Sequence, residues 1–253
     1  MTVASGHLRV EQIMGTAIGI EVRDAVVPAG AVEDAFAYLR RADAQFSTHR
    51  PDSEVSRLSR GELTLNDCSL ELRQVLTLAE QLRIDSRGQF DVRRHRADGR
   101  LDPSGIVKGW VVEEAAWILD AAGARNYAIN AGGDILVRGE PEPGQPWRVG
   151  IRHPLDVEAV AHVLELRGGA VATSGTYERG EHISNPLTAR APQDWLSLTV
   201  VGPSLAYADA YATAGFAMGH DGLAWVNRHH GYRAYGMAGD SAAVHWIEGG
   251  YKE

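Results

Sequence analysis

The chain has 253 residues, a formal net charge of −8 at pH 7 and 44% apolar residues, a composition typical of an ordinary soluble globular protein. Phosphate backbones are bound by clustered Lys and Arg, and the longest basic run here is residues 93–96, so a large nucleic-acid interface is excluded. One cysteine, Cys68, permits neither an internal disulfide nor a thiolate metal cluster, and we expect a buried thiol.

The chain carries no sequence signal for membrane insertion or export. Its longest uncharged stretch, residues 195–208, is shorter than the roughly 18 residues that a spanning helix needs. Residues 1–13 lack a basic start followed by an apolar core. We therefore expect a cytoplasmic protein whose partners include neither nucleic acid nor a membrane interior.

The first half of the chain begins with a strand and continues with helices. We expect an N-terminal tail over residues 1–12, ahead of one domain over 13–253, and a short strand over 13–23. Apolar residues at helical spacing then predict three helices, over residues 31–44, 70–87 and 109–122.

The second half contains most of the strands. Alternating patterns predict strands over residues 127–138, 147–151, 160–166 and 196–201, then helices over 206–218 and 223–228, then strands over 232–237 and 243–247. Because the helices do not alternate strictly with the strands, we predict an α+β fold with a largely antiparallel sheet rather than a doubly wound fold.

Residues 102–110 form a glycine-containing turn that leads into the predicted helix over 109–122. The N–H groups of a helix start attract anions, Gly105 and Gly109 let a ligand approach the backbone, and Lys108 adds a positive charge. The same pattern is typical of a capping turn with a surface lysine. Local sequence leaves a phosphate site and a structural turn both open.

Three further segments could carry chemistry. The pair Gly132-Gly133 inside a strand-like run indicates a bulge or a close approach to the backbone. Asp209 and Thr213, four residues apart on a predicted helix, could both face a hard cation such as Mg²⁺, or serve as a solvated Asp and a Thr bonded to its own helix. His182 could move protons near neutral pH, although it is one of ten histidines.

Taken together and in order, these segments resemble the ApbE family, the flavin transferases that move FMN from FAD onto a protein threonine. The match covers roughly residues 13–220. It is carried by Met14-Gly15-Thr16, residues 46–58, Gly88-Gln89-Phe90-Asp91, residues 102–110, Gly132-Gly133-Asp134, Thr173-Ser174-Gly175 with Tyr177-Glu178-Arg179, His182-Ile183, and residues 209–213.

The resemblance implies a single compact ApbE-like (T-fold-like) domain and an FAD:protein FMN transferase that depends on Mg²⁺, uses FAD as flavin donor, releases AMP and acts on an acceptor protein with an FMN-binding domain. It also assigns residues. FAD contacts are implied for Met14, Gln89, Phe90, Asp91, Asp102, Lys108 and Ile183. Magnesium ligation is implied for the Gly105 carbonyl, Asp209 and Thr213, and His182 is the best candidate to accept the acceptor's hydroxyl proton or to orient the acceptor.

Departures from the family pattern bear on the flavin pocket and on the loop near the acceptor. This chain has His49, Ser59, Asn185 and Ala189 at positions where the family pattern commonly has tyrosine, asparagine, aspartate and glycine, in that order. Two other functions remain open on the same residues. The chain could be an FAD pyrophosphatase, in which water replaces threonine, or a flavin-binding protein without catalysis.

Overall fold

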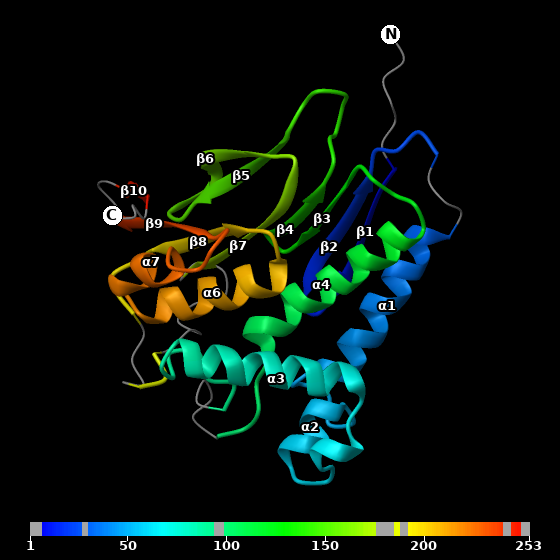
Figure 1. Cartoon of the computed structure of the whole chain (residues 1–253), viewed down its shortest axis with the longest axis vertical. Helices are drawn as coiled ribbons and strands as arrows, with labels where there is room; N and C mark the ends of the chain where they lie inside the picture. Colours follow the sequence, from blue (N-terminus) through cyan, green and yellow to red (C-terminus); the bar gives the residue numbers. More distant parts are fainter. Residues whose placement is uncertain are drawn as a thin grey trace.

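Eight strands of the described residues form one antiparallel sheet at the centre of the molecule (Figure 1). The computed structural model describes residues 7–26, 30–93, 99–175, 185–187, 192–239 and 244–248. The strands are β1 (His7–Ile13), β2 (Thr16–Val22), β3 (Tyr127–Ala131), β4 (Asp134–Arg138), β7 (Gly168–Gly175), β8 (Ser197–Gly202), β9 (Arg233–Gly239) and β10 (Val244–Glu248). They lie side by side in the order β1-β2-β3-β4-β7-β8-β9-β10, which confirms the α+β prediction.

The helices lie on one face of this sheet (Figure 1). They are α1 (Ala31–Phe46), α2 (Glu54–Ser59), α3 (Leu70–Asp85), α4 (Ser104–Ala121), α6 (Leu205–Ala217) and α7 (Asp221–Val226), with a short 3-10 helix at Leu65–Asp67. In α6 every residue except Tyr207 is buried, as expected of a helix that is apolar on all sides. Helix α6 lies beside α4 in the helical layer and packs on β7 and β8, while α4 also packs on β3 and β4.

The edge strand β1 begins at His7, inside the range that we assigned to an N-terminal tail. Its charged residues, Arg9 and Glu11, face α1 and form ion pairs with Glu33 and Arg40. Its apolar Leu8 is 65% exposed on the opposite face. Charges that point toward the core side are a known feature of edge strands. Because of these charges the strand lacks the apolar inner face from which strands are predicted.

The run 127–138 is two strands, not one with a bulge. Gly132 and Gly133 both have positive φ, at 63° and 102°, and form the two-residue turn of the β3–β4 hairpin. Such turns require positive φ at both central residues, which glycine adopts without strain. Strand β7 and helix α2 were not predicted, whereas the helices predicted over 31–44 and 70–87 are confirmed by α1 and α3.

A separate hairpin covers part of the opposite face of the sheet (Figure 1). It consists of β5 (Trp147–His153) and β6 (Asp156–Leu166), which pair antiparallel. Its buried side chains form a second, smaller core with residues of β4, β7 and β9: Val137, Trp147, Val149, Ile151, Val171 and Met237. None of the helices that the structure describes has the length and apolar character needed to cross a bilayer.

Candidate functional site

Helix α4 begins at Ser104, five residues before the predicted start, so the glycine-containing turn is part of the helix. The Asp102 carboxylate accepts a hydrogen bond from the Ser104 N–H at 3.1 Å and so acts at the helix start. Glycines are poor helix formers, which is why the sequence predicted a later start. Their presence is explained by what packs against them.

Both glycines of α4 lie against α6. A Cβ atom on Gly109 would lie 2.9 Å from the Leu205 carbonyl carbon, closer than real Cβ atoms approach, and 3.0 Å from the Ala206 Cα. A Cβ atom on Gly105 would lie 3.4 Å from the Thr213 Oγ1. Glycine at both positions therefore lets α4 approach the backbone and the Thr213 side chain of α6.

Asp209 and Thr213 both face α4 across this contact. The Gly109 N–H donates to Asp209 Oδ2 at 3.0 Å, although in a regular helix it would donate to the Gly105 carbonyl. A backbone carbonyl has two lone pairs, so the Gly105 carbonyl can take part in the helix and still bind another partner. The structure thus brings together the three predicted magnesium ligands from segments about 100 residues apart.

The donor set formed by these residues suits a small hard cation. It combines a carboxylate, a hydroxyl and a backbone carbonyl, the oxygen ligands that Mg²⁺ prefers. Asp209 and Thr213 are only 6% and 7% exposed, and Ser174 Oγ of β7 lies 3.5 Å from Thr213 Oγ1. Within the described ranges no three His, Cys, Asp or Glu side chains converge, so a cation here would depend on this mixed set.

Lys108 projects from α4 toward the β3–β4 turn. Its Nζ lies 2.5 Å from Asp134 Oδ2, and Asp134 is 1% exposed. The other Asp134 oxygen accepts from the Thr173 N–H at 3.0 Å. Asp134 thus fixes the ammonium group, which has three hydrogens and can donate to a phosphate in addition. The sequence assigned no role to Asp134, although an acid directly after a Gly-Gly turn was the available signal.

The turn that contains Met14 lies beside the β3–β4 turn. The Gly132 N–H donates to the Ala17 carbonyl at 3.1 Å, and a Cβ atom on Gly132 would overlap Thr16 Oγ1. Met14 itself has φ 54°, a conformation that few residues other than glycine adopt. The two hairpin turns together place Met14 on the same side of the molecule as Lys108 and Asp134.

The segment between α3 and α4 supplies the remaining predicted flavin contacts. The Gln89 Oε1 is buried and has no hydrogen-bond partner among the described residues, so a donor from a ligand or water would satisfy it. Phe90 is fully buried, its N–H donates to Ser86 Oγ at 2.9 Å, and its ring packs on Gly105. In this structure Phe90 therefore supports the start of α4 through its ring.

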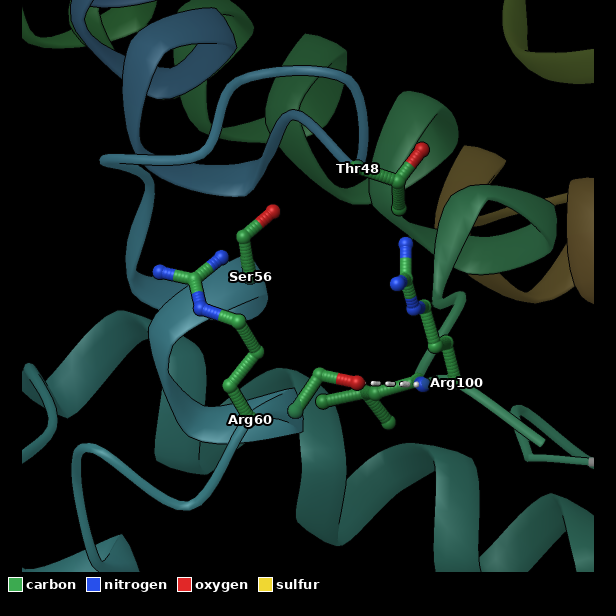
Figure 2. Close-up of a pocket in the computed structure, with 6 residues that line it drawn as sticks. Thr48, Ser56, Arg60 and Arg100 are labelled. Carbon is green, nitrogen blue, oxygen red and sulfur yellow. Dashed lines mark hydrogen bonds between the residues drawn. The ribbon is translucent and has the colours of Figure 1, made fainter. Parts of the chain in front are cut away.

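A small polar cavity of about 30 Å³ lies between α2 and the loop residues before α4. Figure 2 shows the Arg100 side chain extending toward Thr48, with Ser56 and Arg60 on the opposite side. Ser59 Oγ accepts from the Leu101 N–H at 3.0 Å, one residue before Asp102. The cavity has room for about two water molecules, so its residues support the Asp102 segment rather than hold a flavin ring.

Two predicted site residues, His182 and Ile183, lie outside the described residues. The nearest described segment is 185–187, where the Asn185 side chain donates to the Ala217 carbonyl at the end of α6 at 2.8 Å. A Cβ atom on Gly88 would lie 3.5 Å from Leu187. This segment therefore packs between α6 and the flavin-contact segment.

The model of the ApbE family matches residues 14–95 and 92–235, which is most of the chain and includes every described site residue. The chain belongs to the ApbE family. The membership confirms the resemblance read from the motifs, and it places the α4–α6 contact within the matched region.

Three curated relatives, from Vibrio cholerae, Rhodobacter capsulatus and Escherichia coli, are named FAD:protein FMN transferase. The chain is 32% identical to that of Vibrio cholerae over 173 residues, 64% of this chain and 51% of the relative. It is 34% identical to that of Rhodobacter capsulatus over 161 residues, 60% of this chain and 31% of the relative. Against the E. coli protein the values are 29% over 181 residues, 67% and 51%. The chain spans about half the length of the curated relatives it matches.

Solved structures of ApbE proteins have the same fold. The structure named flavin transferase ApbE from Vibrio cholerae superposes with a TM-score of 0.84 at 23% identity and covers 97% of each chain. The ApbE protein from Thermotoga maritima gives a TM-score of 0.82 at 22% identity and covers 95% of this chain and 96% of its own. The ApbE fold is therefore conserved over nearly the whole chain.

Proposed function

We propose that the chain transfers the FMN part of FAD to a threonine side chain of an acceptor protein and releases AMP. The observation that carries this proposal is the α4–α6 contact, which gathers the Gly105 carbonyl, Asp209 and Thr213 beside the cation Lys108. The name of the curated relatives supports the choice of FAD as donor and of a protein as acceptor.

In the proposed reaction the threonine Oγ attacks the FMN-side phosphorus of FAD, and the bond from this phosphorus to the bridging oxygen breaks. AMP leaves with the bridging oxygen, and the hydroxyl proton passes to a base. We propose His182 as that base on the family resemblance. Phosphoryl transfer depends mainly on positioning and charge stabilisation, so the chain needs little covalent chemistry of its own.

Each site residue then has a role that follows from its contacts. Lys108, fixed by Asp134, would donate to a non-bridging phosphate oxygen and hold the diphosphate against α4. Gln89 Oε1, buried without a described partner, would accept a hydrogen bond from the flavin. Asp209, Thr213 and the Gly105 carbonyl would hold Mg²⁺, which when bound neutralises charge on the diphosphate.

The proposal is tested by incubating the purified chain with FAD, Mg²⁺ and a candidate FMN-binding domain from the same genome. The expected result is that the intact mass of the domain increases by one FMN less one water, that AMP appears in equal amount, and that chelation of Mg²⁺ prevents both. Fragmentation of the modified domain should locate the FMN on a threonine.

Two variants of matched charge show whether the α4–α6 contact carries the activity. Asp209→Asn should lower transfer at least about a hundred-fold and raise the Mg²⁺ concentration needed, because it removes the carboxylate from the donor set. Asp221→Asn, at the exposed first position of α7, removes the same charge outside the site and should match the parent chain. Equal activity of Asp209→Asn and the parent would refute this assignment.

The products separate the two other functions. AMP and FMN in solution, with no FMN on the acceptor domain, would identify an FAD pyrophosphatase. Bound FAD that stays intact with Mg²⁺ and acceptor present would identify a flavin-binding protein. Either result would overturn the transferase proposal.

A further inference from the structure

A histidine–aspartate pair outside the proposed site connects α3 to the α6–α7 region. His229 Nε2 lies 2.7 Å from Asp85 Oδ2, and His229 Nδ1 lies 3.1 Å from the Val226 carbonyl oxygen. Both partners are acceptors, and a neutral imidazole has one N–H. In the tautomer with its hydrogen on Nε2, the ring donates this hydrogen to the Asp85 carboxylate, and a hydrogen bond to an ionised acceptor is among the stronger ones.

The position of Asp85 indicates that the carboxylate is there for this contact. Asp85 is the last residue of α3, where the helix dipole disfavours a negative charge. The hydrogen bond between the His229 ring and the carboxylate offsets this repulsion. Helix propensity therefore does not explain the aspartate, whereas the contact with His229 does.

On its other side the His229 ring stacks on α6. Its centroid lies 4.3 Å from that of Tyr211 at an interplanar angle of 32°, and 4.7 Å from that of Trp225 in an edge-on arrangement. Tyr211 is two residues from both Asp209 and Thr213, so it projects from a different side of α6 than they do. Burial raises the Tyr211 pKa, and nearby Tyr232 and Asp85 add to the shift, so this tyrosine stays neutral beside the ring.

The other end of the pair leads directly to the predicted flavin contacts. After Asp85 the chain makes a short turn that is held by the bond from the Gly88 N–H to the Arg83 carbonyl at 2.7 Å. The Phe90 N–H to Ser86 Oγ bond, at 2.9 Å, holds the same turn. A displacement of Asp85 is therefore transmitted to Gln89 and to the residues beside it.

We infer that the Asp85–His229 pair is a positioning clamp that fixes residues 89–91 relative to the ligand-bearing helix α6, and so sets the affinity of the chain for FAD. The inference rests on the proposed function, because it assumes that FAD contacts residues 89–91. Neither Asp85 nor His229 belongs to the proposed metal or phosphate groups.

The test is a double-mutant cycle with FAD affinity as the readout, measured by quenching of flavin fluorescence. His229→Phe keeps a ring on Tyr211 but has no N–H, and Asp85→Ala removes the acceptor. Each is expected to weaken FAD binding about three- to five-fold, the effect of an exposed ion pair, and the double variant no further. Asp85→Asn, which keeps an acceptor oxygen, should lie within about two-fold of the parent. At saturating FAD the transfer rate should change little, so the effect appears in KM rather than kcat.

His220 provides the matched control. Its Nε2 lies 3.2 Å from Asp194 Oδ1 and its ring contacts Trp195 edge-on, an arrangement of the same kind that does not involve α3. His220→Phe should leave FAD affinity unchanged. If Asp85→Ala and His229→Phe lower thermal stability but keep the parental FAD affinity, the pair is only a structural contact and the inference is overturned. It is also overturned if the effects of the two substitutions on FAD affinity are additive in the double variant. If the parent chain binds FAD but transfers no FMN, the proposed function fails while the clamp is still tested by affinity.

Discussion

The contact between α4 and α6 can be opened by one methyl group. In Gly109→Ala the added Cβ would overlap the Leu205 carbonyl oxygen and lie 3.0 Å from the Ala206 Cα. These are backbone atoms of a buried helix, so α4 must move away from α6 because the backbone of α6 cannot give way. The movement would lengthen the 3.0 Å bond from the Gly109 N–H to Asp209 and separate Gly105 from Thr213.

The size of the effect follows from three contributions. Overpacking costs about 1–3 kcal/mol, and loss of a hydrogen bond to a buried carboxylate costs about 1.5–3 kcal/mol. Replacing glycine by alanine inside a helix returns about 1 kcal/mol. We expect Gly109→Ala to lower the free energy of unfolding by about 1.5–5 kcal/mol, a Tm decrease of roughly 3–20 °C for a chain of this length.

Gly105→Ala is the matched comparison, since it gains the same helix propensity in the same helix. Its Cβ would lie 3.3 Å from Thr213 Cγ2 and 3.4 Å from Phe90 Cε2, side-chain atoms that can shift by a few tenths of an ångström. We expect its stability to stay within about 1 kcal/mol of the parent. Urea unfolding followed by circular dichroism measures both. A Gly109→Ala protein as stable as Gly105→Ala, with parental Mg²⁺ dependence of FMN transfer, would refute the account of this contact.

Three further changes test other parts of the structure. Lys108→Ala should lower the free energy of unfolding by about 3 kcal/mol, because it leaves the buried Asp134 without its cation. The double variant Lys108→Ala with Asp134→Asn should recover the stability measured by urea unfolding but not the affinity for FAD. Recovery of both would show that Lys108 does not belong to the phosphate site. Ser59→Ala should lower the free energy of unfolding by about 1 kcal/mol, because it leaves the Leu101 N–H unpaired. Ser59→Asn keeps an acceptor oxygen and should weaken FAD binding less than Ser59→Ala does. Equal losses of FAD affinity in the two variants would contradict the role of Ser59 in supporting the Asp102 segment. The pKa of Asp24 is lowered, since hydrogen bonds from Arg125 and Asn126 outweigh the opposing effect of burial. Its ionised form therefore stabilises the fold above about pH 4. Asp24→Ala should lower the unfolding free energy at pH 7 by about 1–2 kcal/mol, and the difference between variant and parent should shrink as the pH falls below 4. A difference that does not depend on pH would show that the charge is not involved.

The sequence by itself determined the fold class, the helices α1 and α3, and the family, because these depend on periodicity and on short motifs read in order. It also named the residue types that could bind magnesium and phosphate. Each of these signals is local, so it can be interpreted without knowing which segments of the chain are in contact.

Only the tertiary structure decided why those residues have their positions. The glycines of α4 read as a turn because their reason, the close approach of α6, lies about 100 residues away. Asp134 is explained by Lys108, and Asp85 by His229, 144 residues later in the chain. Strand β1 escaped prediction because its inward charges are paired by α1. Local propensity is overridden wherever a long-range contact contributes more than the preference of a single residue, and in this chain such contacts concentrate at the site and its supports.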